Sequence, residues 1–380
     1  MTKIYLDHAA TSPLHPVVID KMITTMNTTF GNPSSIHSFG REARKELDEA
    51  RTAIAKTINA NYSEIVFTSG GTEADNLAIL GTARANRHKG NHIITTEIEH
   101  HAVLHSCQFL EKEGFDVTYL SPNEQGIVTV EAVKNALRDD TILVTIMYGN
   151  NEVGSIQPIR EIGELLSAHE AIFHTDAVQA FGAIELDVTT LGVDLLSVSA
   201  HKINGPKGIG FLYIKNGTTI HPATFGGEQE TKRRAGTENV PAIVGFAEAV
   251  QIAASTIEKK QQTYESFKRI FIETLQEKQI EFFVNGATDQ SLPHILNLSF
   301  PGTDVESMLV NLDMVGIAAS SGSACTAGSI DPSHVLVAMF GTESERIRNS
   351  IRFSFGLANE EDEIRKAATE TANIIERLRN

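Results

Sequence analysis

The sequence reads Ser197-Val198-Ser199-Ala200-His201-Lys202-Ile203-Asn204-Gly205-Pro206-Lys207-Gly208 just beyond its midpoint, and this stretch decides the fold. Apolar residues at 195–198 predict the end of a buried strand, and the glycines after Lys202 end any helix before a strand resumes at 211–214. A lysine at a strand end lies where α/β proteins gather their ligands. Desolvation can lower its pKa, so that the amine attacks a carbonyl and holds an aldehyde cofactor as a Schiff base. A lone lysine is more often a solvated turn residue, so this interpretation depends on residues elsewhere.

The composition narrows the class of protein. The chain has 380 residues, 41% hydrophobic and 21% charged, which is typical of a globular protein of about two domains. Its net charge of −16 disfavours direct binding to nucleic acid. We expect a cytoplasmic protein without a membrane span, because the sequence shows neither a signal peptide nor an apolar run of about 18 residues. The two cysteines, Cys107 and Cys325, exclude a disulfide framework.

Apolar runs alternate with helical segments through the first two thirds of the chain, and the predicted strands are 65–67, 92–95, 117–120, 142–146, 172–174 and 195–198. This alternation predicts an α/β fold with a mainly parallel central sheet flanked by helices. We assign residues 16–260 to this large domain. Residues 1–15 and 261–380 are predicted to form a smaller α+β domain, which carries a mobile loop at about 319–330.

Thr68-Ser69-Gly70-Gly71-Thr72 lies between a strand and a helix and predicts a phosphate cradle. Two glycines let backbone N–H groups approach an anion, and the helix N-terminus adds a partial positive charge. Ser199 and His201 are further candidate phosphate donors. The stretch lacks the Lys-Ser/Thr ending of a nucleotide P-loop, so ATP is not implied. An ordinary N-capped turn fits the same residues.

Asp176 ends a predicted strand, where a carboxylate can keep a pyridine nitrogen protonated, and Gln179 can donate to a ring oxygen. His100 ends another strand and can stack on an aromatic cofactor or move a proton. A metal pair formed by His101 and His105 is the alternative, but no glutamate base or third ligand accompanies their spacing.

Small residues surround Cys325 from Ala318 to Ser329, which predicts a mobile loop with an accessible thiol. Cys107 lies among apolar residues and fits a buried thiol. A tethered thiol is suited to collecting a group at one site and carrying it to another.

Three motifs together resemble the cysteine desulfurases of the NifS/IscS type: 67–73, His201-Lys202 with 205–208, and 320–326. The likeness runs from Tyr5 to Ser354. It implies a fold-type I enzyme that depends on pyridoxal 5'-phosphate (PLP), is class-V aminotransferase-like and works as a homodimer.

The resemblance implies a role for each matched position. Lys202 would be the Schiff-base lysine, Asp176 the pyridinium partner and His100 the stacking residue that moves protons. The other cofactor contacts would be Gly71, Thr72, Asn151, Gln179, Ser199, His201 and, from the other subunit, Thr237. Asn32 and Arg352 would bind the substrate carboxylate, for which the guanidinium fork is suited. No metal site is implied.

The implied reaction converts L-cysteine to L-alanine, with attack by the Cys325 thiolate on the substrate sulfur to form a persulfide. The acceptor would be an iron–sulfur scaffold, a tRNA-thiolation enzyme or a protein of cofactor biosynthesis. The chain stops at Asn380 without the tail with which housekeeping members contact a scaffold, so the acceptor stays open. A selenocysteine lyase, another PLP-dependent aminotransferase, a cysteine hydrolase and a non-catalytic persulfide carrier are the alternatives.

Overall fold

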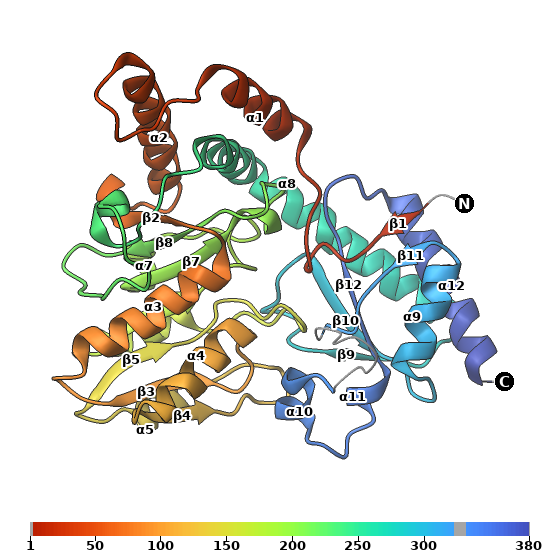
Figure 1. Ribbon diagram of the computed structural model, residues 1–380. Coiled ribbons are helices and arrows are strands. Elements are labelled where there is room, and N and C mark those ends of the chain that lie inside the picture. The colour runs from red at the N-terminus through yellow and green to blue at the C-terminus, as the bar shows by residue number, and fades with distance from the viewer. Residues whose placement is uncertain (1–2, 323–331, 380) are drawn as a thin grey trace.

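The computed structural model describes residues 3–322 and 332–379 of the chain. It contains a large α/β part and a smaller α+β part, which lie side by side in Figure 1. Helix α8 (Val240–Glu277) runs through both parts, and both ends of the described chain lie in the smaller one. Position 325 lies outside the described residues, so the expectation of a mobile loop there stays a prediction.

The large part is built on a seven-stranded sheet with the order β2-β8-β7-β6-β5-β3-β4. Strand β8 is antiparallel to both of its neighbours, and the remaining pairs are parallel. The strands are β2 (Ile65–Thr68), β3 (His92–Thr96), β4 (Asp116–Leu120), β5 (Thr141–Thr145), β6 (Ile172–Asp176), β7 (Leu195–Ser199) and β8 (Gly210–Ile214). Most of their residues are buried, as strands covered by helices on both faces require. The predicted α/β class with a mainly parallel sheet is confirmed.

Helices cover this sheet, and their apolar stripes supply its core. In α2 the spacing of Ala43, Leu47 and Ile54 places them on one face, and all three are fully buried. The helical elements of the large part are α1 (Pro16–Thr28), α2 (Ser38–Thr57), η1 (Tyr62–Glu64), α3 (Gly71–Asn86), α4 (His101–Lys112), α5 (Val130–Ala136), α6 (Ile159–Leu166), α7 (Val188–Leu191), η2 (Ala200–Lys202) and η3 (Gln229–Lys232).

The smaller part holds an antiparallel sheet of order β12-β10-β9 and a parallel pair, β1 with β11. The N-terminal strand β1 therefore pairs with a strand from the C-terminal region. The elements are β1 (Ile4–Tyr5), β9 (Phe283–Asn285), β10 (Ile295–Ser299), α9 (Val305–Met314), β11 (Ile317–Ala318), α10 (His334–Phe340), α11 (Arg346–Asn349), β12 (Ser350–Ser354) and α12 (Glu361–Arg379).

Helix α8 belongs to two hydrophobic cores. Its first half buries Ile243 and Phe246 in the core under the large sheet, and its second half buries Phe267 and Phe271 in the core of the smaller part. The predicted domain boundary near 260 falls inside this helix and stays a prediction. Among the described residues, α8 is long and apolar enough to cross a membrane by length and composition, but 56% of the relevant window is buried inside the fold.

Candidate active site

A cavity of about 360 Å³ lies beyond the carboxyl ends of β6 and β7, between the two parts of the molecule. It brings together ten of the predicted site residues: Gly71, Thr72, His100, Asn151, Asp176, Gln179, Ser199, His201, Lys202 and Arg352. Its volume is in the usual range for a small-molecule site. Residues separated by up to 281 positions in sequence therefore line one space.

Lys202 reaches the cavity from η2, the short turn that follows β7. Its Nζ donates hydrogen bonds to the carbonyl oxygens of Ala9 and Ala10, the second at 2.8 Å. Burial, followed by the charge of Arg352, lowers the lysine pKa to about 8, although Asp176 and Asp7 oppose this shift. About a tenth of the amine is thus uncharged at pH 7, far more than for an ordinary lysine, and the uncharged form is the nucleophile toward a carbonyl.

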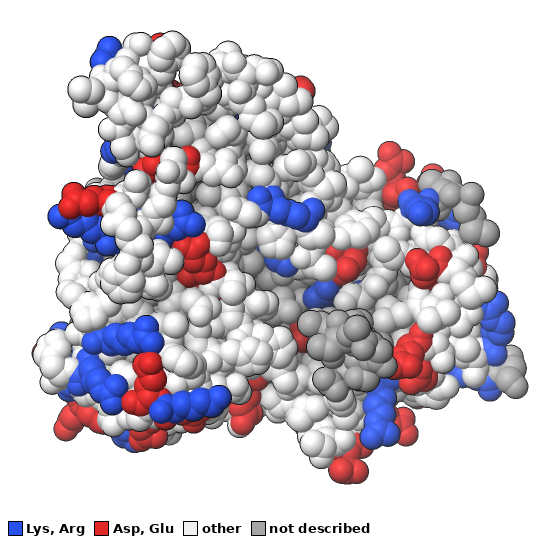
Figure 2. All heavy atoms as spheres, in the orientation of Figure 1, with Lys and Arg blue, Asp and Glu red and all other residues white. Residues whose placement is uncertain are grey.

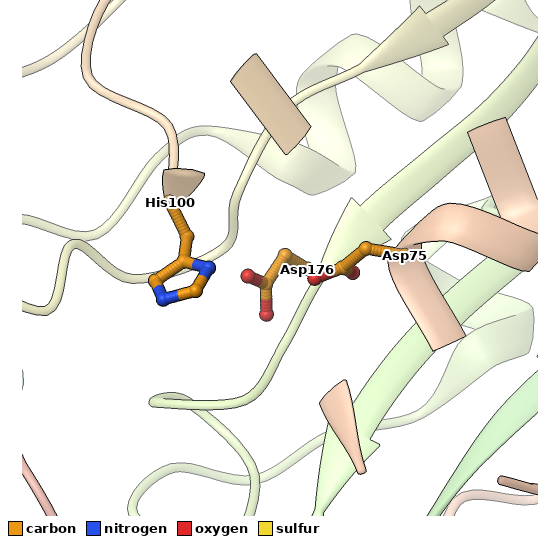
Figure 3. Close-up of side chains that lie close together, drawn as sticks. All are labelled: Asp75, His100 and Asp176. Carbon is orange, nitrogen blue, oxygen red and sulfur yellow. The ribbon is translucent and has the colours of Figure 1, made fainter. Parts of the chain in front are cut away.

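Asp176 lies at the end of β6, and the Val178 N–H donates to its Oδ1 at 2.8 Å. Burial raises its pKa to about 6, while the Val178 N–H and the charge of Lys202 oppose the shift. Asp75 of α3 lies beside it, and oxygens of both carboxyl groups and a nitrogen of His100 lie within 4.8 Å of one another (Figure 3). Burial and the charge of Asp176 raise the Asp75 pKa well above its usual range. The pair therefore holds a single negative charge at neutral pH.

His100 is the N-cap of α4, and its Nδ1 accepts a hydrogen bond from the Ala102 N–H at 3.1 Å. The ring lines the cavity. Desolvation by the surrounding protein, followed by the charge of Lys202, lowers its pKa to about 4. The imidazole is therefore neutral at physiological pH. It can stack on an aromatic ring or accept a proton.

His101 and His105 lie farther along α4 with their ring centroids 5.1 Å apart. His334 approaches His101 with a centroid distance of 4.7 Å. Within the described part of the chain, the group with the spacing of metal ligands is instead Asp75, His100 and Asp176. That group faces the predicted cofactor position, so we interpret it as the surroundings of an aromatic ring.

The predicted phosphate cradle forms the N-terminus of α3. Gly70 has φ +148°, and a Cβ on Gly71 would lie 2.7 Å from Cγ2 of Val178, so the close approach requires glycine. The first amides of a helix lack intrahelical partners and attract anions. Thr72 and Ser199 line the same end of the site, and the donor set suits a phosphate monoester.

The opposite wall comes from the smaller part and centres on Arg352 of β12. This side chain is buried; its two Nη atoms donate to the carbonyl oxygen of Asn151 and to Oδ1 of Asp7, both at 2.8 Å. Its Nε is buried and has no hydrogen-bond partner. An unpartnered N–H of a guanidinium beside the cavity is suited to binding a carboxylate.

Among the described residues, two predicted site residues, Asn32 and Thr237, do not line this cavity. Asn32 is exposed in the α1–α2 connection, where its Oδ1 accepts from the Ser34 N–H. Thr237 lines a separate hollow of about 200 Å³ with Ser69. Cys325 lies outside the described residues.

Two buried carboxyl groups of the cavity wall, Asp75 and Glu152, were missed as site residues by sequence reasoning. Asp75 could have been found, because it follows Thr72 by three residues on α3 and such positions share a helix face. Glu152 carried a positional signal, because it follows a predicted strand in the polar run Asn150-Asn151-Glu152, but no role could be assigned to it, since its side-chain partner Ser333 is far away in sequence.

A wider hollow of about 1,100 Å³ lies along α2, away from these residues. Its ion pairs, Arg44 with Asp48 and Lys45 with Glu49, are exposed on the helix surface. Exposed pairs contribute little to binding or stability. The smaller cavity, with its buried ionisable groups, is the better candidate.

Comparison with known proteins decides the family. A family model described as "Aminotransferase class-V" matches residues 4–366. The chain belongs to the aminotransferase class-V family. A Bacillus subtilis (strain 168) relative named "Putative cysteine desulfurase IscS 1" is 61% identical over 378 residues, with 100% of both chains covered.

Solved structures agree with the sequence comparison. A structure described as "NIFS-LIKE PROTEIN" has a TM-score of 0.93 and 34% identity, and the match covers 99% of this chain and 100% of the other. Another, described as "SspA in complex with cysteine", has a TM-score of 0.82 and 38% identity, with 93% and 99% covered. The NifS/IscS resemblance and the fold-type I architecture predicted from the sequence are confirmed.

Proposed function

We propose that this protein is a PLP-dependent cysteine desulfurase, which converts L-cysteine to L-alanine and transfers the sulfur to Cys325. The observation that carries the proposal is one cavity that joins the half-buried amine of Lys202, the carboxylate of Asp176 and the glycine cradle at Gly70 and Gly71. Relatives named cysteine desulfurase, and a solved structure described with cysteine, support it.

The residues around the cavity fit PLP. Gly71, Thr72, Ser199 and His201 would hold the phosphate, Asp176 the ring nitrogen, Gln179 and Asn151 the ring oxygen region, and Lys202 the aldehyde carbon. PLP supplies an electron sink for the electrons released when the substrate loses its Cα proton. The single negative charge of the Asp176–Asp75 pair would keep the ring nitrogen protonated, which strengthens that sink.

Two neutral bases are available for the protons of the reaction. Lys202 in its uncharged form and the neutral imidazole of His100 both open onto the cavity. We assign removal of the Cα proton to Lys202 and proton delivery during product formation to His100. Arg352 would bind the substrate carboxylate through its free Nε and orient the amino acid toward these bases.

The sulfur step follows from the reach of position 325. Gly322 lines the cavity and precedes Cys325 by three residues. A chain spans at most about 3.3–3.6 Å per residue, so a linker of three residues can bridge up to roughly 11 Å. Cys107 is fully buried on α4, and burial raises the pKa of its thiol, so it is a poor nucleophile.

The transfer balances without an external oxidant. The Cys325 thiolate attacks the substrate sulfur and forms an S–S bond. The Cβ–S bond of the substrate breaks, and its electron pair remains with the carbon skeleton, which then takes up a proton. The products are alanine and a Cys325 persulfide, whose outer sulfur is available to an acceptor.

We further propose a homodimer in which Thr237, and by the same reasoning Asn32, reach the cavity of the partner subunit. Neither residue lines the cavity of its own chain among the described residues. Large apolar side chains are exposed nearby in sequence: Phe30 is 74% exposed, Ile36 91% and Phe225 86%. Such exposure is typical of a protein–protein interface.

The acceptor is proposed to be a protein of iron–sulfur assembly, tRNA thiolation or thio-cofactor synthesis in the cytoplasm. On the face drawn in Figure 2, acidic and basic side chains are interspersed. Together with the net charge of −16, this favours a protein acceptor over direct contact with nucleic acid.

The test of the proposed function is purification with PLP, followed by addition of L-cysteine. We expect a visible absorption band and stoichiometric formation of alanine and persulfide sulfur. A colourless protein, or cysteine consumption without alanine, would contradict the proposal.

The shared site of the dimer has its own test. A mixture of inactive Lys202→Ala and Thr237→Ala chains should regain activity, because one of the two sites in each mixed dimer is then complete. No recovery of activity in a mixed dimer would contradict the shared site.

A further inference from the structure

His294 is a histidine at the junction of the two parts, and the roles assigned above do not include it. It lies directly before β10 in the smaller part, where its carbonyl oxygen accepts a hydrogen bond from the Phe355 N–H at 2.9 Å. Its ring atom Nε2 lies 3.2 Å from Oε1 of Gln179, in the turn that follows β6 of the large part. A side chain of the smaller part therefore contacts a residue that we expect to bind the cofactor.

Apolar packing holds the segments that carry this contact. A small buried cluster joins the turn after β6, the segment before β10 and the segment after β1. Its members are at most 2% exposed; they are Ala9, Ala180, Leu292 and Ile295. Close packing of such side chains leaves little room for the segments to shift. The positions of His294 and Gln179 relative to each other are therefore set by the junction itself.

The partners of the Gln179 amide fix its orientation. Its Nε2 lies 2.9 Å from the carbonyl oxygen of Ala9, which can only accept, so the nitrogen must face Ala9. Oε1 then faces His294 and can only accept, so Nε2 of His294 must carry a proton. Burial, followed by the charge of Lys268, lowers the pKa of His294 to about 3. The neutral ring has a single N–H, and it is the one that donates to Gln179.

These two contacts leave one N–H of the Gln179 amide for a ligand. Gln179 is 6% exposed and lines the cavity together with Lys202, whose Nζ donates to the same carbonyl oxygen of Ala9. Without the N–H of His294, the buried Oε1 of Gln179 would lose its partner, which costs free energy. The amide would then be free to rotate and to offer its oxygen to the cavity instead.

We propose that His294 is a positioning residue for the cofactor, which fixes the Gln179 amide so that an N–H faces the ring oxygen of PLP. This inference rests on the proposed function, because it takes PLP as the cofactor. A hydrogen bond from an N–H favours the anionic form of the ring oxygen, whereas an amide oxygen in the same place would repel it. His294 acts through Gln179 and need not touch PLP.

The test compares the binding of two cofactors to the full-length apoenzyme. One is PLP, and the other is an analogue of PLP in which hydrogen replaces the ring hydroxyl group. Fluorescence titration measures the Kd of each for the parent protein, His294→Leu and His294→Gln. We expect His294→Leu to raise the Kd of PLP about threefold or more and to leave the Kd of the analogue unchanged. His294→Gln should restore PLP binding, because its amide N–H can donate from nearly the same place.

A double variant tests whether His294 acts through Gln179. Gln179→Ala should weaken PLP binding at least as much as His294→Leu does, and His294→Leu should add no further loss in the Gln179→Ala background. His92→Leu is the matched control. His92 is also buried and contacts the hydroxyl groups of Thr118 and Thr141, but it is not among the described residues that line the cavity. We expect His92→Leu to bind both cofactors as the parent does.

The inference is overturned by an unchanged PLP Kd in His294→Leu, by an equal loss of affinity for both cofactors, or by an equal loss in His92→Leu. Should His294→Leu not fold, NMR of the parent protein with isotope-labelled histidine replaces it. We expect a neutral His294 ring with its proton on Nε2, and a proton on Nδ1 would contradict the inference.

The proposed function and this inference give different results when they fail. An apoenzyme that binds no PLP would end both. PLP binding that is equal in the parent and in His294→Leu would end the role of His294 and leave the proposed function intact.

Discussion

The two walls of the cavity are held in place in different ways. In the wall from the large part, Asp176 ends β6, Lys202 lies in the turn η2 after β7, and His100 is the N-cap of α4. The sheet and its first connections therefore position all three side chains. The wall from the smaller part is held by contacts across the molecule, such as that of Arg352 with Asp7, 345 positions away. The difference indicates that cofactor chemistry is built into the sheet, while substrate orientation and sulfur delivery depend on how the two parts meet.

We call the wall from the large part the sheet wall. The largest expected loss of activity comes from a substitution in this wall. Lys202→Ala should abolish covalent attachment of PLP and lower turnover by at least about a thousandfold, because the amine forms the bond to the cofactor. Absorption spectra and alanine assays measure both effects. Lys268→Met is a matched control: burial also lowers the pKa of Lys268 to about 8, but its Nζ donates to Ser291 and Leu292 outside the cavity. Equal losses in the two variants would contradict a special role for Lys202.

The next effect separates the two acids of the sheet wall. Asp176→Asn should lower kcat by about a hundredfold or more and weaken PLP binding, because the ring nitrogen loses its anionic partner. Asp75→Asn should cost about tenfold or less, since Asp75 already carries the proton of the pair at neutral pH. Fluorescence titration of PLP into the apoenzyme and steady-state kinetics provide the comparison. A larger loss of kcat in Asp75→Asn than in Asp176→Asn would show that the proton lies on Asp176 instead.

A change in the opposite wall should act on the substrate and spare the cofactor. Arg352→Lys retains a positive charge but loses the planar fork, so we expect KM for L-cysteine to rise about tenfold or more with an unchanged PLP spectrum. Steady-state kinetics and absorption spectra on one preparation measure both. Loss of the PLP band in this variant would break the distinction between the two walls.

The last prediction concerns the pH dependence of the free energy of unfolding, through Glu99, which is buried next to the sheet wall. Glu99 is fully buried beside His100, accepts hydrogen bonds from the Thr96 hydroxyl and the Met147 N–H, and has its pKa raised to about 8 by burial. Between about pH 4.5 and 8 the folded state keeps a proton that the unfolded state has released, so stability falls as pH rises through this window.

Glu99→Gln removes this proton linkage. We expect its free energy of unfolding to fall less than that of the parent between pH 6 and 9, by up to a few kcal/mol, because each pKa unit corresponds to about 1.4 kcal/mol. Urea unfolding at both pH values measures the difference. Parallel pH profiles of the two proteins would show that Glu99 ionises normally in the fold.

The sequence predicted the sheet wall better than the opposite wall, for physical reasons. The ends of β6 and β7 and the glycine cradle are local features, visible as apolar runs followed by polar or glycine residues. The hydrogen bond from Ser333 to Glu152 depends on the packing of the two parts, which no local spacing encodes. The continuous helix α8 across residue 260 agrees with the absence of proline and glycine near that position, but the sequence did not show that this one helix serves the cores of both parts.

The proposed function requires that sulfur pass from L-cysteine to the thiol at position 325. Incubating the PLP-loaded enzyme with L-cysteine and analysing its peptides by mass spectrometry tests this most directly. We expect one added sulfur atom on Cys325, none on Cys107, and one alanine for each persulfide formed. Alanine formed in full while Cys325 stays unmodified, or sulfur found on Cys107, would contradict it.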